Sequence, residues 1–315
     1  MHEILINDIY EPIFVSCYNN KRNAGGIYRL HNDELIPIFD EINCHGLFYY
    51  KEHNLLFCVT RKMPQIVCFK VLKNNQIQRY DIKFKNYTFG EDAHGICIVE
   101  KKLFLIATNG DSDSDKAVNA QGIKTNKVGK IIVSDLEFNT DHLVIKDSKI
   151  INPFDCSHHH HINEICFARN NFFMTSFSYC HNNKNFVENG AISSFRLSDY
   201  KTELFLDGFV KPHSLSFYND KLYLVSSADS KIFSINLNDK SICLEYKGPD
   251  VFIKGLLVTD QHFYIGMNYS IGRTDSKFVN SVKGILKFNR ITGETKKISL
   301  PPQSNNVYSI VKSYF

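Results

Sequence analysis

Short runs of alternating apolar and polar residues, joined in pairs by polar turns, recur along the whole chain. One pair lies in residues 211–227 (KPHSLSFYNDKLYLVSS), another in residues 93–109 (AHGICIVEKKLFLIATN) and a third in residues 44–60 (CHGLFYYKEHNLLFCVT). The alternation, and the richness in aromatic and β-branched residues, predict β-hairpins. Similar pairs begin near residues 162 and 253, so the hairpin is a repeating unit of this chain.

Each predicted hairpin is followed by two further strand-like runs, so sets of four strands recur at intervals of roughly 40 to 65 residues, as in propeller blades. Residues 11–40 supply three more strands, and residues 306–315 supply the missing first strand of that set. We therefore predict an all-β fold, a six-bladed β-propeller forming a single domain over residues 1–315 and closed by pairing of the N- and C-terminal strands. Seven blades is the alternative, and residues 3–7 (EILIN) are an alternative inner strand for the closing blade.

The composition mainly excludes certain classes of partner and location. The 315 residues are 43% hydrophobic and carry a formal net charge of +4 with scattered basic residues, which gives no sign of a nucleic-acid or membrane partner. No apolar run approaches the length of a transmembrane helix, and the first residues lack the apolar core of a signal peptide. The nine cysteines include no CxxC pair, which indicates reduced thiols. These features predict a cytoplasmic location.

Histidines recur at one register position of the predicted inner strands. The position two residues before the first inward apolar residue is occupied, blade by blade, by His45, His94, Asn163, His213, Lys254 and Tyr308. Because the first strand of each propeller blade lines the central channel, these six residues are expected to ring one mouth of it. His161 lies two residues before Asn163, on the same side of an extended strand.

Imidazole groups that converge in a confined channel make a site for a divalent transition metal, and Mn, Fe, Zn and Ni are all compatible with it. The predicted ligands are His45, His94, His161 and His213. His181 or Tyr179, in the loop after the second strand of its blade, is predicted to act as acid or base near this metal. Two alternatives remain open: the histidines fill the channel by packing, or one of them is a metal-free general base.

Polar residues around the same mouth predict a substrate-binding surface. The predicted contacts are Arg61, Asn109, Asn163, Glu164, Lys254 and Tyr308. Amide, cationic and phenol groups suit a hydroxylated or anionic ligand such as a sugar acid. Glu164 allows two further interpretations, a carboxylate that holds a histidine tautomer or a carboxylate on the surface.

The units in residues 93–109 and 211–227 resemble the P-H-G-I, turn, L-W-F-T repeat of virginiamycin B lyase-like propellers. They are also similar to the six-bladed group that holds SMP-30-like gluconolactonases, strictosidine synthase-like proteins and a further bacterial propeller family. This resemblance implies the propeller fold, and in the lyases a metal near the channel mouth and a nearby histidine carry out an elimination. The histidine of the repeat is matched by His45, His94 and His213 and replaced at Lys254 and Tyr308. The Glu, Asn and Asp metal set of the lactonases is not recognisable in this sequence.

Two hypotheses about function follow. In the first, the protein is a metal-dependent lyase or hydrolase that acts on a polar, carbohydrate-like substrate at the mouth of the channel. In the second, it is a non-catalytic propeller that binds a sugar, a peptide or a partner protein, and the histidines pack the channel. Both hypotheses predict a small-molecule or protein ligand, with no nucleic acid and no membrane.

Overall fold

The computed structural model describes residues 11–19, 24–40, 43–60, 65–72, 76–88, 93–108, 129–153, 162–177, 190–268 and 283–313. These residues form strands joined by tight turns, with one short 3-10 helix, η1 (Lys51–His53). Turn residues such as Asn219 (φ 45°) and Asp220 (φ 61°) adopt the positive φ that a two-residue hairpin needs and that Asn and Asp tolerate. No helix in the described residues is long and apolar enough to span a bilayer.

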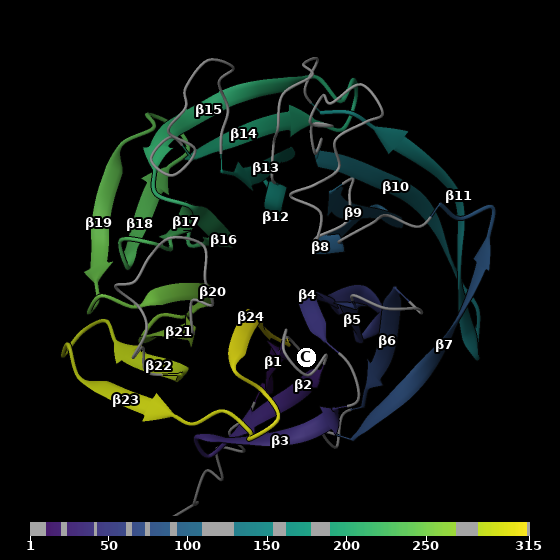
Figure 1. Ribbon diagram of the computed structural model, residues 1–315. Coiled ribbons are helices and arrows are strands. Elements are labelled where there is room, and N and C mark those ends of the chain that lie inside the picture. The colour runs from purple at the N-terminus through teal and green to yellow at the C-terminus, as the bar shows by residue number, and fades with distance from the viewer. Residues whose placement is uncertain are drawn as a thin grey trace, which may run out of the picture.

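The described strands assemble into five sheets around a common centre (Figure 1). Four sheets have four strands each, in the following orders from the centre outward: β24 (Asn306–Lys312), β1 (Ile13–Asn19), β2 (Ala24–His31), β3 (Glu34–Phe39); β12 (Ile162–Ala168), β13 (Asn171–Ser176), β14 (Gly190–Arg196), β15 (Thr202–Phe209); β16 (Pro212–Tyr218), β17 (Lys221–Ser226), β18 (Lys231–Asn236), β19 (Ile242–Lys247); β20 (Phe252–Val258), β21 (His262–Asn268), β22 (Gly284–Asn289), β23 (Thr295–Ile298). The fifth sheet has eight strands, in the order β4 (Cys44–Tyr50), β5 (Leu55–Thr60), β6 (Ile66–Val71), β7 (Ile77–Lys85), β11 (His142–Ile151), β10 (Gly129–Phe138), β9 (Lys102–Thr108), β8 (Ala93–Val99). This arrangement confirms an all-β propeller.

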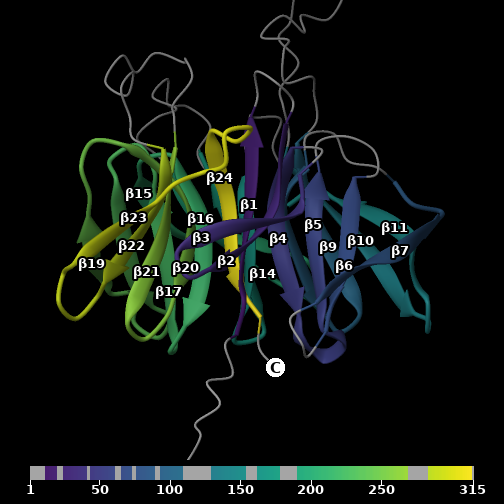
Figure 2. The same ribbon diagram turned by 90° about the horizontal axis from the view of Figure 1, so that it is seen from below.

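Six inner strands surround the centre of the molecule. β4, β8, β12, β16, β20 and β24 contact one another in turn, and β24 also contacts β4, so the ring is closed. β24 pairs antiparallel with β1, with Phe14 opposite Val311 and Tyr18 opposite Asn306. The predicted pairing of N- and C-terminal strands is therefore confirmed, whereas the alternative inner strand at residues 3–7 lies outside the described residues. Figure 2 shows the strands running between the two faces of the disc.

The prediction of six separate blades is not met, because two of the expected blades form the single eight-stranded sheet. Their outer strands, β7 and β11, pair in parallel over five residue pairs, from His142 opposite Asp81 to Lys146 opposite Lys85. The physical reason lies in strand length. β7 has nine residues and β11 has ten, whereas the outer strands β3, β15, β19 and β23 have six, eight, six and four. The longer strands reach across the gap and satisfy each other's edge groups.

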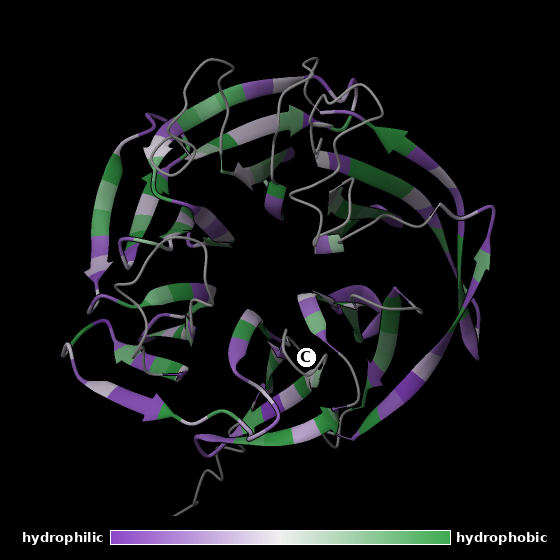
Figure 3. Ribbon diagram, in the orientation of Figure 1, coloured by the Kyte–Doolittle hydropathy of each residue, from purple (hydrophilic) through white to green (hydrophobic). Residues whose placement is uncertain are grey.

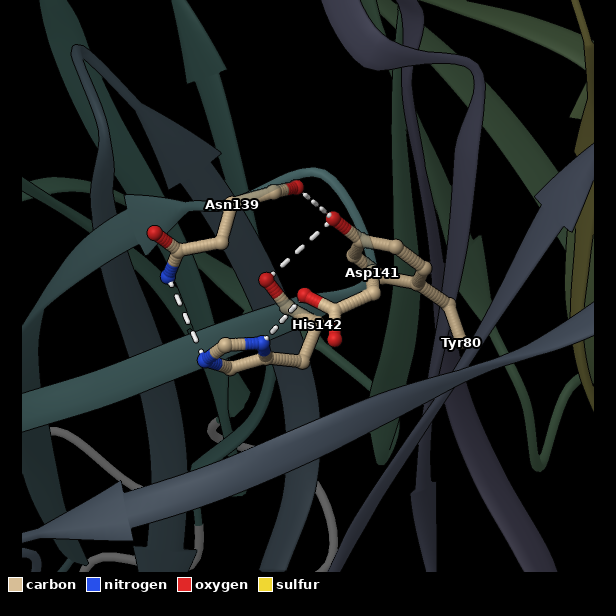
Figure 4. Close-up of polar contacts among 4 residues, drawn as sticks. All are labelled: Tyr80, Asn139, Asp141 and His142. Atoms are coloured by element: carbon tan, nitrogen blue, oxygen red, sulfur yellow. Dashed lines mark hydrogen bonds and ion pairs between the residues drawn. The ribbon is translucent and has the colours of Figure 1, made fainter.

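A group of polar contacts around Tyr80, called here the Tyr80 clasp, holds the paired strands β7 and β11 together; it also includes Asn139, Asp141 and His142 (Figure 4). The Tyr80 hydroxyl on β7 donates to the backbone oxygen of Asn139 and lies 3.2 Å from that of His142, both at the β10–β11 turn. The turn is itself held by side chains: Nδ1 of His142 is 2.7 Å from a carboxylate oxygen of Asp141, and its Nε2 is 3.4 Å from the amide nitrogen of Asn139. One tyrosine thus ties the outer strand of one four-strand unit to a turn of the next.

The core lies in layers between neighbouring four-strand units, each layer joining side chains of two units. The second strands form the centre of these layers, and all six side chains of β5 are buried. Aromatic side chains bridge the layers, as where the Phe104 ring lies 4.3 Å from the Phe172 ring, centroid to centroid. Outer strands such as β7 and β23 are largely hydrophilic (Figure 3). The apolar layers fix the units rigidly and so set the positions of the inner strands.

Candidate functional site in the central channel

The six residues predicted to ring the channel mouth lie on the inner strands and form a buried layer, called here the channel plug. Their exposed fractions are 3% for His45, 7% for His94, 1% for Asn163, 5% for His213, 7% for Lys254 and 2% for Tyr308. The shared register therefore places them inside the molecule. The part of the channel that they occupy is filled by side chains.

Three aromatic rings of the plug are nearly parallel. The His45 ring is 4.5 Å from the Tyr308 ring at an angle of 12° and 5.5 Å from the His94 ring at an angle of 2°. The His94 and Tyr308 rings are 5.9 Å apart at 12°. Tyr18, on β1, meets the His45 ring edge-on at 5.4 Å. Tyr18 was not among the predicted site residues, although its place opposite Asn306 in the closing pair of strands is a signal that could have identified it.

A buried cation rests on this group of rings. The Lys254 Nζ atom lies 3.5 Å from the centroid of the Tyr308 ring and 5.8 Å from that of Tyr18. A desolvated ammonium over a phenol ring gains a cation–π attraction of about 2 kcal/mol. The Tyr308 hydroxyl is 3.4 Å from the backbone oxygen of Asn163, which ties β24 to β12 across the channel. The plug thus combines a positive charge, flat rings and amide groups.

One hydrogen bond fixes the tautomer of His45. Its Nδ1 atom lies 3.1 Å from the backbone oxygen of Ala93. Because a carbonyl oxygen only accepts, Nδ1 carries the hydrogen, and Nε2 of the neutral ring is the basic nitrogen. A backbone carbonyl that orients an imidazole in this way determines which ring nitrogen can act as a base.

His213 does not join the other two histidines. Its Nδ1 is 2.9 Å from the backbone oxygen of Lys211 and 2.8 Å from the Ser227 hydroxyl, at the end of the neighbouring strand β17. Its ring meets the edges of Phe177 and Phe252 at 5.1 and 5.3 Å. The shared register position therefore does not give a shared side-chain direction.

Glycines next to the histidines let the inner strands approach closely. A Cβ atom on Gly46 would collide with the backbone oxygen of His94, and one on Gly95 would lie 2.7 Å from a carboxylate oxygen of Glu164. These contacts explain the His-Gly dipeptides of β4 and β8. The absent side chains bring β4, β8 and β12 together, and the two imidazole rings stack as a result.

Three of the four predicted metal ligands, His45, His94 and His213, lie among the described residues. No group of three His, Cys, Asp or Glu side chains that could hold a metal ion occurs among the described residues. A metal ion must lie close to the plane of each imidazole that binds it, and the parallel rings of His45 and His94 do not share a plane. The fourth predicted ligand, His161, lies outside the described residues, so the four-histidine site stays a prediction.

Four more of the predicted site residues also lie outside the described residues: the acid–base candidates His181 and Tyr179, and the substrate contacts Arg61 and Asn109. Their roles stay predictions. Of the remaining contacts, Asn163, Lys254 and Tyr308 belong to the plug. The Asn163 amide nitrogen donates to the backbone oxygen of Pro212 at 3.0 Å, while its buried side-chain oxygen has no hydrogen-bond partner in the described structure.

Glu164 lies just beyond the plug. The described contacts match neither a carboxylate that holds a histidine tautomer nor a carboxylate on the surface. Its carboxylate accepts a hydrogen bond from the backbone N–H of Ile165 at 3.2 Å and no described hydrogen bond from a histidine. It is not on the outer surface either, since it lines a cavity inside the channel. Burial raises the pKa of this carboxyl to about 8, against smaller opposing effects of the Ile165 N–H and the charge of Lys254.

Comparisons with known proteins support the fold and no more than the fold. No protein-family model matches the sequence, and no curated protein matches it. Among solved structures, a chain of the nidogen–laminin complex is similar with a TM-score of 0.63 and 10% identity, over 96% of this chain and 98% of that one. A candidate 6-phosphogluconolactonase from Bacteroides fragilis has a TM-score of 0.58 and 11% identity, over 98% and 99%. The periplasmic gluconolactonase of Pseudomonas aeruginosa has a TM-score of 0.57 and 8% identity, over 96% and 99%.

Proposed function

We propose that this chain is a hydrolase that acts on a small carbohydrate-like substrate, of the sugar-lactone class, at the end of the channel that holds the plug. The observation that carries the proposal is the pairing of an oriented base with a buried cation. His45 is held by the Ala93 carbonyl, and Lys254 lies on the same tyrosine ring that His45 stacks against. The gluconolactonase and candidate 6-phosphogluconolactonase among the similar structures support the substrate class.

These groups supply the two functions that lactone hydrolysis needs. His45 Nε2 takes a proton from water as the water oxygen bonds to the lactone carbonyl carbon, and the Lys254 ammonium stabilises the oxyanion that forms. The ring C–O bond then breaks, and the imidazolium returns its proton to the departing alkoxide oxygen. The product is a hydroxy acid. The Tyr308 ring holds the two groups in place, since His45 stacks against it and the Lys254 ammonium lies over it.

A panel of aldono-lactones tests this proposal. We expect wild-type protein to open at least one lactone, and His45→Gln and Lys254→Met each to lower kcat/KM by about 100-fold or more. His31→Gln and Lys201→Met change exposed residues of the same types and are expected to leave kcat/KM unchanged. Activity is expected to survive treatment with EDTA. Loss on chelation with recovery on adding Mn²⁺ or Zn²⁺ would contradict the metal-free chemistry and favour the four-histidine site.

A second candidate function rests on a different observation, the near-complete burial of the whole plug. Residues packed this closely fill a channel well, and a propeller with a filled channel can serve as a binding protein without catalysis. The similarity to a chain of the nidogen–laminin complex supports a binding function as much as the similarity to the lactonases supports an enzymatic one. Protein that turns over no lactone, and in which His45→Gln lowers the free energy of unfolding, would favour this second function.

A further inference from the structure

The half of the channel beyond the plug contains a cavity of about 340 Å³. All six inner strands line it, and on each strand the lining begins one or two residues after the plug residue, as at Leu47, Glu164 and Ser309. The first lining residues are mostly buried, while Val99 and Lys312, further along their strands, are half-buried. The cavity therefore has its inner end at the plug and leads toward the opposite ends of the inner strands. Its volume is at the small end of the range for ligand pockets.

Polar groups gather at the inner end of an otherwise apolar wall. One carboxylate oxygen of Glu164 accepts from the Ile165 N–H, and its second oxygen has no hydrogen-bond partner among the described residues. The Ser214 hydroxyl accepts from the backbone N–H of Gly255 at 2.8 Å and keeps its hydrogen to donate. Ser309, on β24, is a second serine in the lining of the cavity. A carboxylate, two hydroxyls and apolar walls form a built site for a ligand with one polar end.

The titratable groups around Glu164 come from three strands. Cys97 on β8 and Cys166 on β12 have thiols whose pKa values burial raises, and the Glu164 charge raises them further. The Lys254 ammonium on β20 acts on Glu164 from the plug side, where it rests on the Tyr308 ring. At the outer end, Lys312 is already paired with Glu11. The thiols stay uncharged at neutral pH, so the carboxyl is the group whose charge a ligand changes.

We propose that this cavity is a second binding site, separate from the plug, for a small organic amine whose ammonium group binds the Glu164 carboxylate and the Ser214 and Ser309 hydroxyls. The apolar wall, formed by side chains such as Ile96, Leu215 and Leu256, takes the hydrocarbon part of the amine. The geometry favours a cation over a neutral alcohol, because a half-buried carboxylate with one weak partner gains most from a charge-assisted hydrogen bond.

The pH dependence of this site has a definite sign. In the empty cavity the pKa of Glu164 is raised to about 8, so at pH 7 the carboxyl is mainly protonated. An alkylammonium ion, with a pKa near that of lysine, is charged throughout this range. Binding of the cation selects the ionised carboxylate and releases the proton. Apparent affinity therefore rises by up to about tenfold per pH unit below pH 8 and levels off above it.

The probe pair is phenethylamine and 2-phenylethanol, which differ only in the charged group. Titration calorimetry of wild-type protein between pH 6 and 9 is expected to show the amine binding about tenfold or more tightly than the alcohol at pH 8. The amine affinity is expected to follow the pH profile above, with about one proton released per amine bound at pH 7. An alcohol that binds as tightly, a flat pH profile or no binding of the amine at millimolar concentration would each overturn the proposal.

Substitution separates this site from a general affinity for amines. Glu164→Gln keeps the shape of the side chain and removes its charge, and it is expected to abolish both the preference for the amine and the pH dependence. Glu203→Gln, on the exposed outer strand β15, is the matched control and is expected to change neither. Circular dichroism verifies that both variants fold. If Glu164→Gln does not fold, the comparison of the amine with the alcohol on wild-type protein still tests the proposal. Equal loss of amine binding in both variants would overturn the site.

Discussion

At the scale of single residues, the channel shows what a register position determines and what it leaves open. The repeat in the sequence placed six residues on the inner strands and correctly brought His45, His94, Lys254 and Tyr308 together. It could not give side-chain directions, because a register position does not show which nearby polar groups a side chain will bond to. The Ser227 hydroxyl and the Lys211 carbonyl turn His213 away, and only the structure shows them beside it. Burial of the plug was expected only in the alternative in which the histidines pack the channel.

Glu164 carries the clearest residue-scale prediction, since its pKa is raised from about 4.5 to about 8 in the folded protein. Between these values the unfolded chain has lost a proton that the folded protein still holds, so the free energy of unfolding falls as pH rises. We expect Glu164→Gln to become more stable relative to wild type from pH 5 to pH 8, by up to about 1.4 kcal/mol per pH unit. Urea unfolding at several pH values measures this. A stability difference that does not change with pH would contradict the raised pKa of this carboxyl.

At the scale of strands and sheets, the sequence predicted the inner and middle strands better than the outer ones. Continuous apolar runs, as in β5 (LLFCVT), mark strands that pack on both faces, and these were found along the chain. Outer strands carry mixed patterns, as in β7 (IQRYDIKFK), and nothing in such a pattern says which edge a strand will pair with. The parallel pairing of β7 with β11 joins strands that are far apart in the sequence. It therefore appeared only in the structure.

The Tyr80 clasp gives the element-scale prediction. Tyr80→Phe removes the hydroxyl that bonds the β10–β11 turn, and we expect the free energy of unfolding to fall by about 1 kcal/mol. Hydrogen exchange should speed up in residues 77–85 and 142–146 and not in the distant sheet of β16 to β19, because the loss is local. The control is Tyr246→Phe, whose hydroxyl makes no described hydrogen bond. Faster exchange spread evenly over all sheets, or none at residues 142–146, would show that the clasp does not hold the joint.

At the scale of the whole molecule, closure of the ring was predictable because both chain ends carried strands without partners. The structure confirms that β24 pairs with β1 and contacts the inner strands β20 and β4. There it contributes the buried side chains of Val307, Tyr308 and Ile310. The cavity was not predictable at this scale. It arises from the spacing of six strands brought together by contacts across the ring, and no local pattern in the sequence records that spacing.

Closure also gives the last prediction, made at the scale of the ring. Deleting residues 307–315 removes the inner strand of one sheet, exposes the edge of β1 and opens the ring between β20 and β4. Each large buried side chain removed costs about 2 to 5 kcal/mol, and the three together approach or exceed the usual total stability of about 5 to 15 kcal/mol. We therefore expect the truncated protein to lose its cooperative unfolding transition in calorimetry and to expose apolar surface. Deleting only residues 314–315 leaves β24 whole and is the control, expected to unfold as wild type does. A sharp transition at the wild-type temperature in the longer truncation would mean that the remaining sheets hold together without closure, and that the pairing of β24 with β1 is incidental to the fold.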